Sequence, residues 1–120
     1  MTKSIKVALA GAGAFGIKHL DGIKNIDAVE VVSLVGRRLE PTREIAAKYG
    51  IAHAATDLAD SLARKEVDAV ILCTPTQMHA AQTIACLKAG KHVQVEIPLA
   101  DSWADAQAVA DLAKATGLVA

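Results

Sequence analysis

Short apolar runs alternate with amphipathic stretches along the whole chain. The apolar runs, rich in valine, isoleucine and alanine, predict strands at 5–10, 29–35, 51–55, 67–73 and 92–96. Near-continuous apolar runs are typical of parallel strands that are covered on both faces. A further apolar run at 118–120 predicts the beginning of a sixth strand.

Between these runs, apolar residues recur every three or four positions, which predicts helices. In the first of them Ile17, Leu20 and Ile23 share one face. The other helices are expected from Pro41 to Tyr49, from Asp57 to Arg64, from about Gln77 to Ala89, and from Asp101 or Ser102 to Gly117.

Strands that alternate with helices predict parallel β/α units joined by right-handed crossovers. We therefore expect an α/β fold, a doubly wound parallel sheet of the Rossmann type, with strand order 3-2-1-4-5-6 and a truncated last strand. Sheets of this kind bind their ligands across the carboxyl ends of the strands, where the strand order reverses. The 120 residues are expected to form one domain.

Composition narrows the possible functions. Apolar residues make up 52% of the chain, and 13 basic residues balance 13 acidic ones. A net charge of zero argues against binding to nucleic acid or to an anionic membrane, and 2% aromatic residues leave little for stacking on bases. Cys73 and Cys86 have neither metal-ligand spacing nor a disulfide-rich setting. We predict no metal site and two reduced, mostly buried thiols in a cytoplasmic protein.

A glycine-rich loop follows the first predicted strand. Gly11, Gly13 and Gly16 have the G-x-G-x-x-G spacing of a dinucleotide-binding βαβ unit, and Ala14 and Phe15 fall in the first turn of the next helix. Unpaired amides and the positive end of the helix dipole suit a pyrophosphate. The alternative is a tight strand-to-helix connection that binds no nucleotide.

The second predicted strand is followed by Arg37 and Arg38, where NAD-binding folds commonly place an acidic residue for the ribose hydroxyl. Guanidinium groups can hold a 2′-phosphate, which a carboxylate would repel. The sequence therefore predicts NADP as the cofactor, with NAD possible. The alternative is a solvated arginine pair on a loop.

Two further segments lie at the same end of the predicted sheet. The fourth predicted strand, 67–73, is followed by Thr74, Pro75, Thr76 and His79, which could line the nicotinamide ribose. Alternatively, Thr76 caps the following helix and His79 is only a polar residue in its first turns. The spacing of His19, His53 and His92 suggests no partners for them, so we expect them to be structural or exposed.

Glu96 and Ile97 close the fifth strand beside Pro98. The Glu96 carboxylate could bond to the nicotinamide ribose or orient a substrate, or it could simply be a charged strand end. Ile97 can neither donate nor accept a proton. The Ile97–Pro98 bond is a candidate for a cis peptide.

Taken together, these motifs resemble the N-terminal domain of the glucose–fructose oxidoreductase/inositol dehydrogenase family. The resemblance rests on residues 11–16 with His19, on Cys73-Thr74-Pro75 with His79, and on 91–93 leading into Glu96-Ile97-Pro98. It implies that residues 1–120 are an NAD(P)-binding domain without its C-terminal substrate and oligomerisation domain. The family's usual Glu-Lys-Pro is here Glu-Ile-Pro, so its catalytic lysine cannot be carried over and we assign no catalytic residue.

The resemblance implies an NADP-dependent dehydrogenase whose partners are a nicotinamide dinucleotide and a small-molecule substrate bound by the other domain. The full-length protein is expected to be a homo-oligomer, and these residues alone are expected to be inactive. Two alternatives remain open. One is a family dehydrogenase that acts on a sugar or inositol, and the other is a non-catalytic NADP-binding or redox-sensing module.

Overall fold

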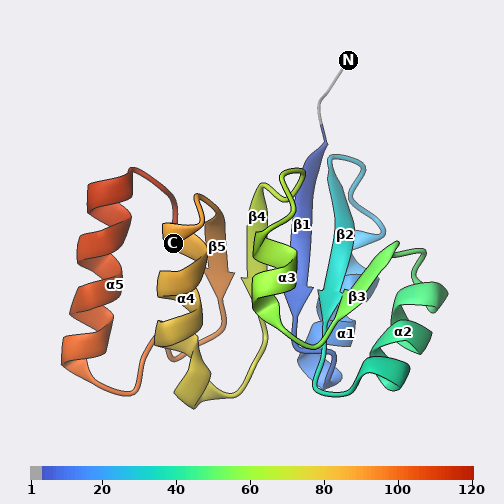
Figure 1. Cartoon of the computed structure of the whole chain (residues 1–120), viewed down its shortest axis with the longest axis horizontal. Coiled ribbons are helices and arrows are strands. Elements are labelled where there is room, and N and C mark those ends of the chain that lie inside the picture. The colour runs from blue at the N-terminus through green and yellow to red at the C-terminus, as the bar shows by residue number, and fades with distance from the viewer. Residues whose placement is uncertain (1–3) are drawn as a thin grey trace.

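Five parallel strands form one sheet at the centre of the computed structural model, which describes residues 4–120 (Figure 1). The strands are β1 (Ile5–Ala10), β2 (Val29–Val35), β3 (His53–Ala55), β4 (Ala69–Leu72) and β5 (His92–Val95). Their order is β3-β2-β1-β4-β5, which confirms the doubly wound parallel sheet. The order reverses between β1 and β4.

The sixth strand expected at 118–120 was a wrong prediction, because these residues form no strand in the structure. The segment nevertheless reaches β5, where the Val93 N–H donates to the Val119 carbonyl at 2.9 Å. Val119 makes this contact, but the segment forms no regular ladder with β5.

All of the predicted helices are present, with altered ends. They are α1 (Ala14–Ile23), α2 (Leu39–Lys48), α3 (Leu58–Leu62), the 3₁₀ turn η1 (Thr76–Met78), α4 (His79–Lys88) and α5 (Trp103–Thr116). Helix α2 begins two residues before Pro41, because the first turn of a helix needs no N–H from a proline. Within the described residues, none of the helices is long and apolar enough to cross a membrane.

Capping side chains fix two helix starts. The Asp57 carboxylate accepts the Ala59 N–H at 3.0 Å at the start of α3. Of the two candidates for α5, Ser102 is the cap, because its hydroxyl accepts the Asp105 N–H at 3.1 Å.

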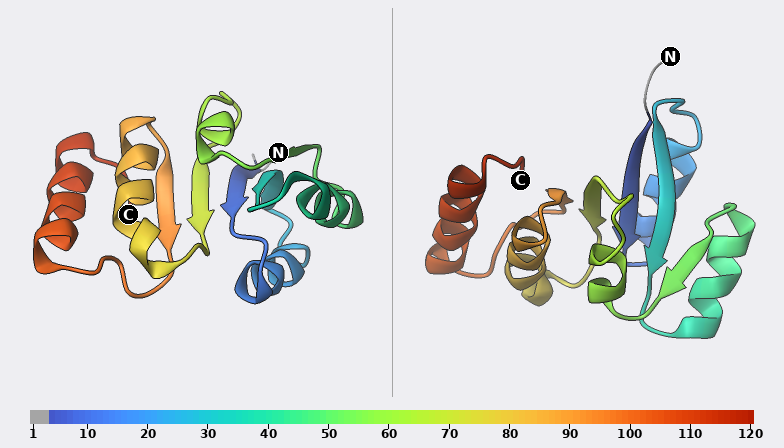
Figure 2. Two further views of the ribbon diagram at one scale, coloured as in Figure 1. Left: turned by 60° about the horizontal axis from the view of Figure 1, so that its bottom comes forward. Right: turned by 45° about the horizontal axis from the view of Figure 1, so that its top comes forward.

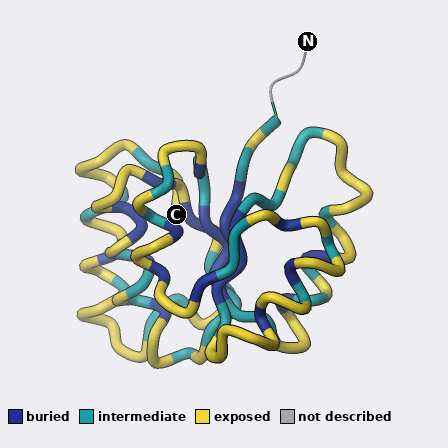
Figure 3. Tube along the Cα trace, turned by 45° about the vertical axis from the view of Figure 1, so that its right-hand side comes forward, coloured by how far each residue is buried: buried dark blue, intermediate teal, exposed yellow. Residues whose placement is uncertain are grey.

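The two faces of the sheet bury separate apolar clusters. On one face Val7 and Leu9 of β1 pack with Leu20 of α1 and with α2. On the other face Ala8 and Ala10 pack with α3, α4 and α5. Helix α1 accordingly lies behind the sheet in Figure 1, α3 and α4 lie in front of it, and Figure 2 shows both layers. The buried residues are concentrated along the central strands (Figure 3).

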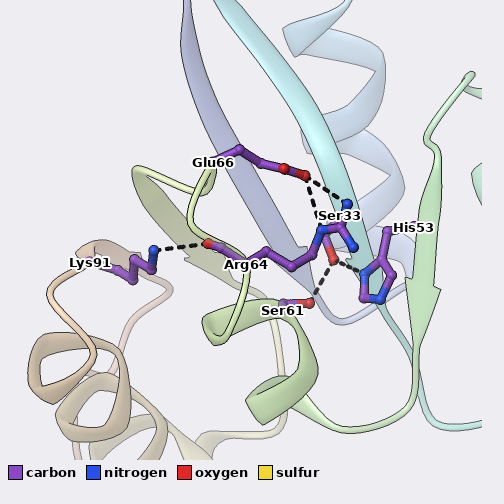
Figure 4. Close-up of polar contacts among 6 residues, drawn as sticks. All are labelled: Ser33, His53, Ser61, Arg64, Glu66 and Lys91. Atoms are coloured by element: carbon purple, nitrogen blue, oxygen red, sulfur yellow. Dashed lines mark hydrogen bonds and ion pairs between the residues drawn. The ribbon is translucent and has the colours of Figure 1, made fainter.

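A short polar network joins α3 to the sheet (Figure 4). The Ser33 hydroxyl of β2 lies 2.7 Å from His53 Nδ1 and 2.6 Å from the Ser61 hydroxyl of α3. Beyond α3, the buried Lys91 ammonium donates to the Arg64 carbonyl at 3.0 Å. These bonds hold α3 over the carboxyl half of β2, next to the groove described below.

Candidate functional site

The glycine loop lies where the strand order reverses, and its first and third glycines are required by close packing. Gly11 has a φ of 101°, and a Cβ there would collide with the Cys73 carbonyl at the end of β4. A Cβ on Gly16 would overlap the Gly11 carbonyl oxygen. The loop can therefore lie this close to β4 and α1 only with glycine at both positions.

The second glycine is different, because it faces open space. No heavy atom lies within 4 Å of the position that a Cβ would take on Gly13, and its φ of −83° is available to any residue. Gly13 is also the N-cap of α1, which has no side-chain cap and no acidic residue in its first turn. The first amides of α1 are thus free to bind an anion from outside the chain.

A groove of about 1290 Å³ runs from this loop across the carboxyl ends of the strands. Gly11 and Gly13 line it, α2 and α3 contribute one wall, and η1 and one face of α4 contribute the other. Apolar side chains make up much of these walls, with a few polar groups between them. This size and lining are typical of a pocket for a cofactor of dinucleotide size.

Arg37 and Arg38 line the same groove, directly after β2, and both side chains are exposed. The Arg38 carbonyl accepts the Thr42 N–H at 3.2 Å and the Thr42 hydroxyl at 2.6 Å, which fixes the backbone beside the guanidinium. Asp57 also lines the groove, where its carboxylate caps α3. The two arginines give this end of the groove a positive charge.

Thr74 and Pro75 line the opposite wall. The Thr74 hydroxyl donates to Gln82 Oε1 on α4, so it is already engaged within the chain. Thr76 begins η1 and makes no side-chain cap, which contradicts the capping alternative for this residue.

His79 lies outside the groove lining and is 2% exposed. Its Nδ1 is 2.8 Å from the Pro98 carbonyl, and its Nε2 is 2.7 Å from the Thr74 carbonyl. Both partners are acceptors, so the ring donates both bonds when it is protonated and one of them when it is neutral. His79 therefore joins the loop after β4 to the loop after β5.

Glu96 and Ile97 follow β5, and the Ile97–Pro98 peptide is cis. The Ile97 side chain is 89% exposed. Glu96 Oε1 lies 2.7 Å from His19 Nε2 on α1. His19 thus has a partner that its place in the sequence did not suggest, because 77 residues separate the two.

Cys73 lies beside this pair. Its sulfur and the ligand atoms of His19 and Glu96 are all within 4.8 Å of one another. Burial, together with the nearby Glu96 carboxylate, raises the pKa of the Cys73 thiol to about 11. The histidine comes from α1, and the cysteine and the carboxylate come from the loops after β4 and β5. Spacing along the sequence could therefore not reveal the cluster.

The predicted cofactor residues thus fall into two groups. The groove is lined by Gly11, Gly13, Arg37, Arg38, Thr74 and Pro75. Its lining does not include Ala14, Phe15, Gly16, Thr76, His79, Glu96 or Ile97. Sequence reasoning missed the walls, which include Thr42, Leu58, Leu62, Met78, Ala81 and Gln82. Their positions just after predicted strands and along one face of α4 are the signal that could have found them.

Comparison with known proteins agrees with this architecture. The model of the oxidoreductase family with an NAD-binding Rossmann fold matches residues 5–120. The chain belongs to this family, which is the glucose–fructose oxidoreductase/inositol dehydrogenase family expected from its motifs.

A curated relative from Sphingobium sp., 4-carboxy-2-hydroxymuconate-6-semialdehyde dehydrogenase, is 69% identical over 115 residues. The match covers 96% of this chain but 36% of that enzyme, so the chain spans about a third of the relative's length.

Two solved structures show the same fold with different cofactors bound. The WlbA dehydrogenase of Chromobacterium violaceum, in complex with NADH and UDP-GlcNAcA, has a TM-score of 0.90 at 29% identity. The match covers 97% of this chain and 34% of WlbA. The 3-ketoreductase KijD10 of Actinomadura kijaniata, in complex with NADP and TDP-benzene, has a TM-score of 0.90 at 26% identity. This match covers 97% of this chain and 37% of KijD10. This chain is thus an NAD(P)-binding Rossmann domain.

Proposed function

We propose that this chain binds NADP and forms the cofactor-binding part of a dehydrogenase. The observation that carries the proposal is that Arg37 and Arg38 line the same groove as Gly11 and Gly13. A groove with an anion site at its centre and two guanidinium groups at one end suits a pyrophosphate and a ribose 2′-phosphate.

The chain's backbone would hold the pyrophosphate. The amides concerned are those of Gly13, Ala14, Phe15 and Gly16 in the loop and the first turn of α1. Gly11 would contribute through its close packing on β4, because its own N–H already donates to the Val35 carbonyl at 2.8 Å. The open space at Gly13 allows phosphate oxygens to approach the backbone closely. Arg37 and Arg38 would contact the adenosine ribose through charge-assisted hydrogen bonds.

The nicotinamide ribose would lie toward the ends of β4 and β5. Around it we place Thr74, Pro75, Thr76, Glu96 and Ile97. His79 would act through the backbone, because both of its ring nitrogens face the carbonyls of Thr74 and Pro98. It positions the two loops and does not reach the cofactor.

The Sphingobium relative suggests the substrate. We propose that the full-length protein oxidises the cyclic hemiacetal of 4-carboxy-2-hydroxymuconate-6-semialdehyde to 2-pyrone-4,6-dicarboxylate. NADP⁺, when bound, would accept the hydride that leaves the hemiacetal carbon, and a base would take the hydroxyl proton. Ile97 cannot be that base, so we place the base, the rest of the substrate pocket and the oligomer interface in another part of the protein.

Calorimetric titration with NADP and with NAD tests the cofactor proposal. The double variant Arg37→Ala/Arg38→Ala is expected to bind NADP about tenfold to hundredfold more weakly, because it loses charge-assisted hydrogen bonds to the 2′-phosphate. Its affinity for NAD is expected to stay nearly unchanged, since NAD has no such phosphate.

Arg43→Ala is the matched control. Arg43 is exposed on α2, pairs with Glu40 at 3.1 Å and does not line the groove. It should leave both affinities unchanged. If the double variant keeps the NADP preference of the original chain, the arginine clamp is refuted.

A further inference from the structure

His19, Cys73 and Glu96 converge at the carboxyl ends of β4 and β5, outside the part that the proposed function uses for the phosphates. His19 projects from α1, whereas Cys73 and Glu96 directly follow β4 and β5. Their ligand atoms are all within 4.8 Å of one another. The side chains of His19 and Glu96 are 25% and 36% exposed, so solvent can reach the cluster.

These three groups are the donor types that zinc prefers. Zn²⁺ binds imidazole nitrogen, thiolate sulfur and carboxylate oxygen at about 2.0–2.3 Å in a tetrahedral arrangement. Ligand atoms in such a site are about 3.2–3.7 Å apart. Around an ion, the Cys73 sulfur would move about 1 Å toward the other two ligands, and the His19–Glu96 pair, which is 2.7 Å apart, would separate by about 0.5 Å. Three protein ligands leave the fourth position for water.

The backbone already holds the ligands in place. The Cys73 N–H donates to the Ala10 carbonyl at 2.8 Å, and the Glu96 N–H donates to the Leu72 carbonyl at 3.1 Å. His19 lies within α1. Little conformational freedom is therefore lost when a metal binds, because only side-chain rotations remain to be fixed.

The charges also match. On binding, the Cys73 thiol would release its proton to solvent, giving one thiolate, one carboxylate and one neutral imidazole. Two negative charges balance one Zn²⁺, which suits a half-buried position. A hard cation such as Mg²⁺ or Ca²⁺ would gain little from the sulfur and the imidazole.

We propose that His19, Cys73 and Glu96 form a binding site for one zinc ion. The bound ion joins α1 to the ends of β4 and β5, in place of the direct contact between His19 and Glu96. Cys73 also lines the cofactor groove, and Glu96 is one of the residues that we place around the nicotinamide ribose. Zinc binding without dinucleotide and NADP binding without zinc are measured separately, so the failure of one proposal is distinguishable from the failure of the other.

The test is titration of the reduced, chelator-treated chain with ZnCl₂ and with CoCl₂, without dinucleotide. We expect one ion per chain by calorimetry and a higher melting temperature with zinc. The cobalt complex should show the near-ultraviolet thiolate-to-cobalt charge-transfer band and the visible bands of tetrahedral cobalt.

Single substitutions locate the site. His19→Gln, Cys73→Ser and Glu96→Gln should each weaken zinc binding about tenfold or more, and Cys73→Ser should abolish the charge-transfer band. Cys86→Ala and His92→Gln, which remove the same residue types elsewhere, should leave binding unchanged. Circular dichroism checks that each variant is folded.

Two results would overturn the proposal. One is the absence of binding at millimolar zinc, and the other is a cobalt complex of the unchanged chain that lacks the charge-transfer band. The second result is decisive even if a variant fails to fold, because it needs no substitution.

Discussion

The buried thiol of Cys86 shows how strongly the interior of this chain disfavours a charge. The residue is 0% exposed on α4, in the cluster that packs against Ala8 and Leu72. Burial raises the pKa of the Cys86 thiol from its ordinary value of 9.0 to about 12. At neutral pH the thiol is therefore protonated and unreactive, in line with the buried, reduced cysteines expected from the sequence.

This raised pKa makes stability depend on pH in a defined direction. Above pH 9.0 the unfolded chain releases the Cys86 proton, whereas the folded chain keeps it up to about pH 12. Unfolding then becomes easier as pH rises, by up to about 1.4 kcal/mol per pH unit from this group. Urea unfolding between pH 9 and pH 11 should show a shallower decline for Cys86→Ala than for the original chain. Parallel curves would contradict the prediction.

At the scale of elements, the loops after β4 and β5 are held together by one side chain. His79 begins α4, and its ring lies between the Thr74 and Pro98 carbonyls. Because both loops belong to the proposed nicotinamide end, the geometry of that end depends on a residue buried beneath it.

Replacing His79 should therefore destabilise the chain. His79→Ala removes the ring that donates to one of these carbonyls when neutral and to both when protonated, and it opens a cavity. The expected cost is about 3 kcal/mol in the free energy of unfolding. Gln77→Ala, an exposed position in η1, is the control and should change stability little. Chemical denaturation of both variants measures the difference, and equal values would show that the bridge contributes nothing.

The elements themselves were largely predictable, and their ends were not. Apolar runs located every strand of the sheet, because strands covered on both faces leave a strong signal. The start of α2 was misplaced because proline is accepted at more than one position of a first turn. The segment 118–120 was wrongly predicted to be a strand. Three apolar residues do not distinguish a strand with a regular hydrogen-bond ladder from a segment that makes a single contact.

At the scale of the whole molecule, the groove runs between walls that are far apart in the chain. Its lining extends from Gly11 to Ala85. Sequence reasoning found the groove's floor and its charged end, since both follow strands directly. It missed the helical walls and the partner of His19, because side chains brought together from distant elements leave no local pattern.

Binding along this groove should stabilise the entire chain. At a concentration one hundred times its dissociation constant, a ligand that binds only the folded state adds about 2.7 kcal/mol. For a chain of this size NADP is then expected to raise the melting temperature by about 10 °C. Differential scanning calorimetry with and without NADP measures the shift.

Gly13→Val gives the critical comparison. The variant should fold, because the φ of Gly13 and the space around it allow a side chain, yet it should lose the shift because valine would occupy the phosphate position. Gly22→Ala adds a methyl group in similarly open space on α1. This variant should still show the rise in melting temperature with NADP. A full shift with Gly13→Val would refute binding at this loop.

The contact between Val93 and Val119 has a consequence for self-association. β5 is an edge strand of only four residues, and β3 at the opposite edge has three. One of the outward N–H groups of β5 already donates to the segment 118–120, and His92 and Gln94 are exposed along the strand. A second copy of this chain could form few backbone hydrogen bonds at either edge of the sheet. Edge-to-edge pairing of sheets from two molecules is therefore disfavoured.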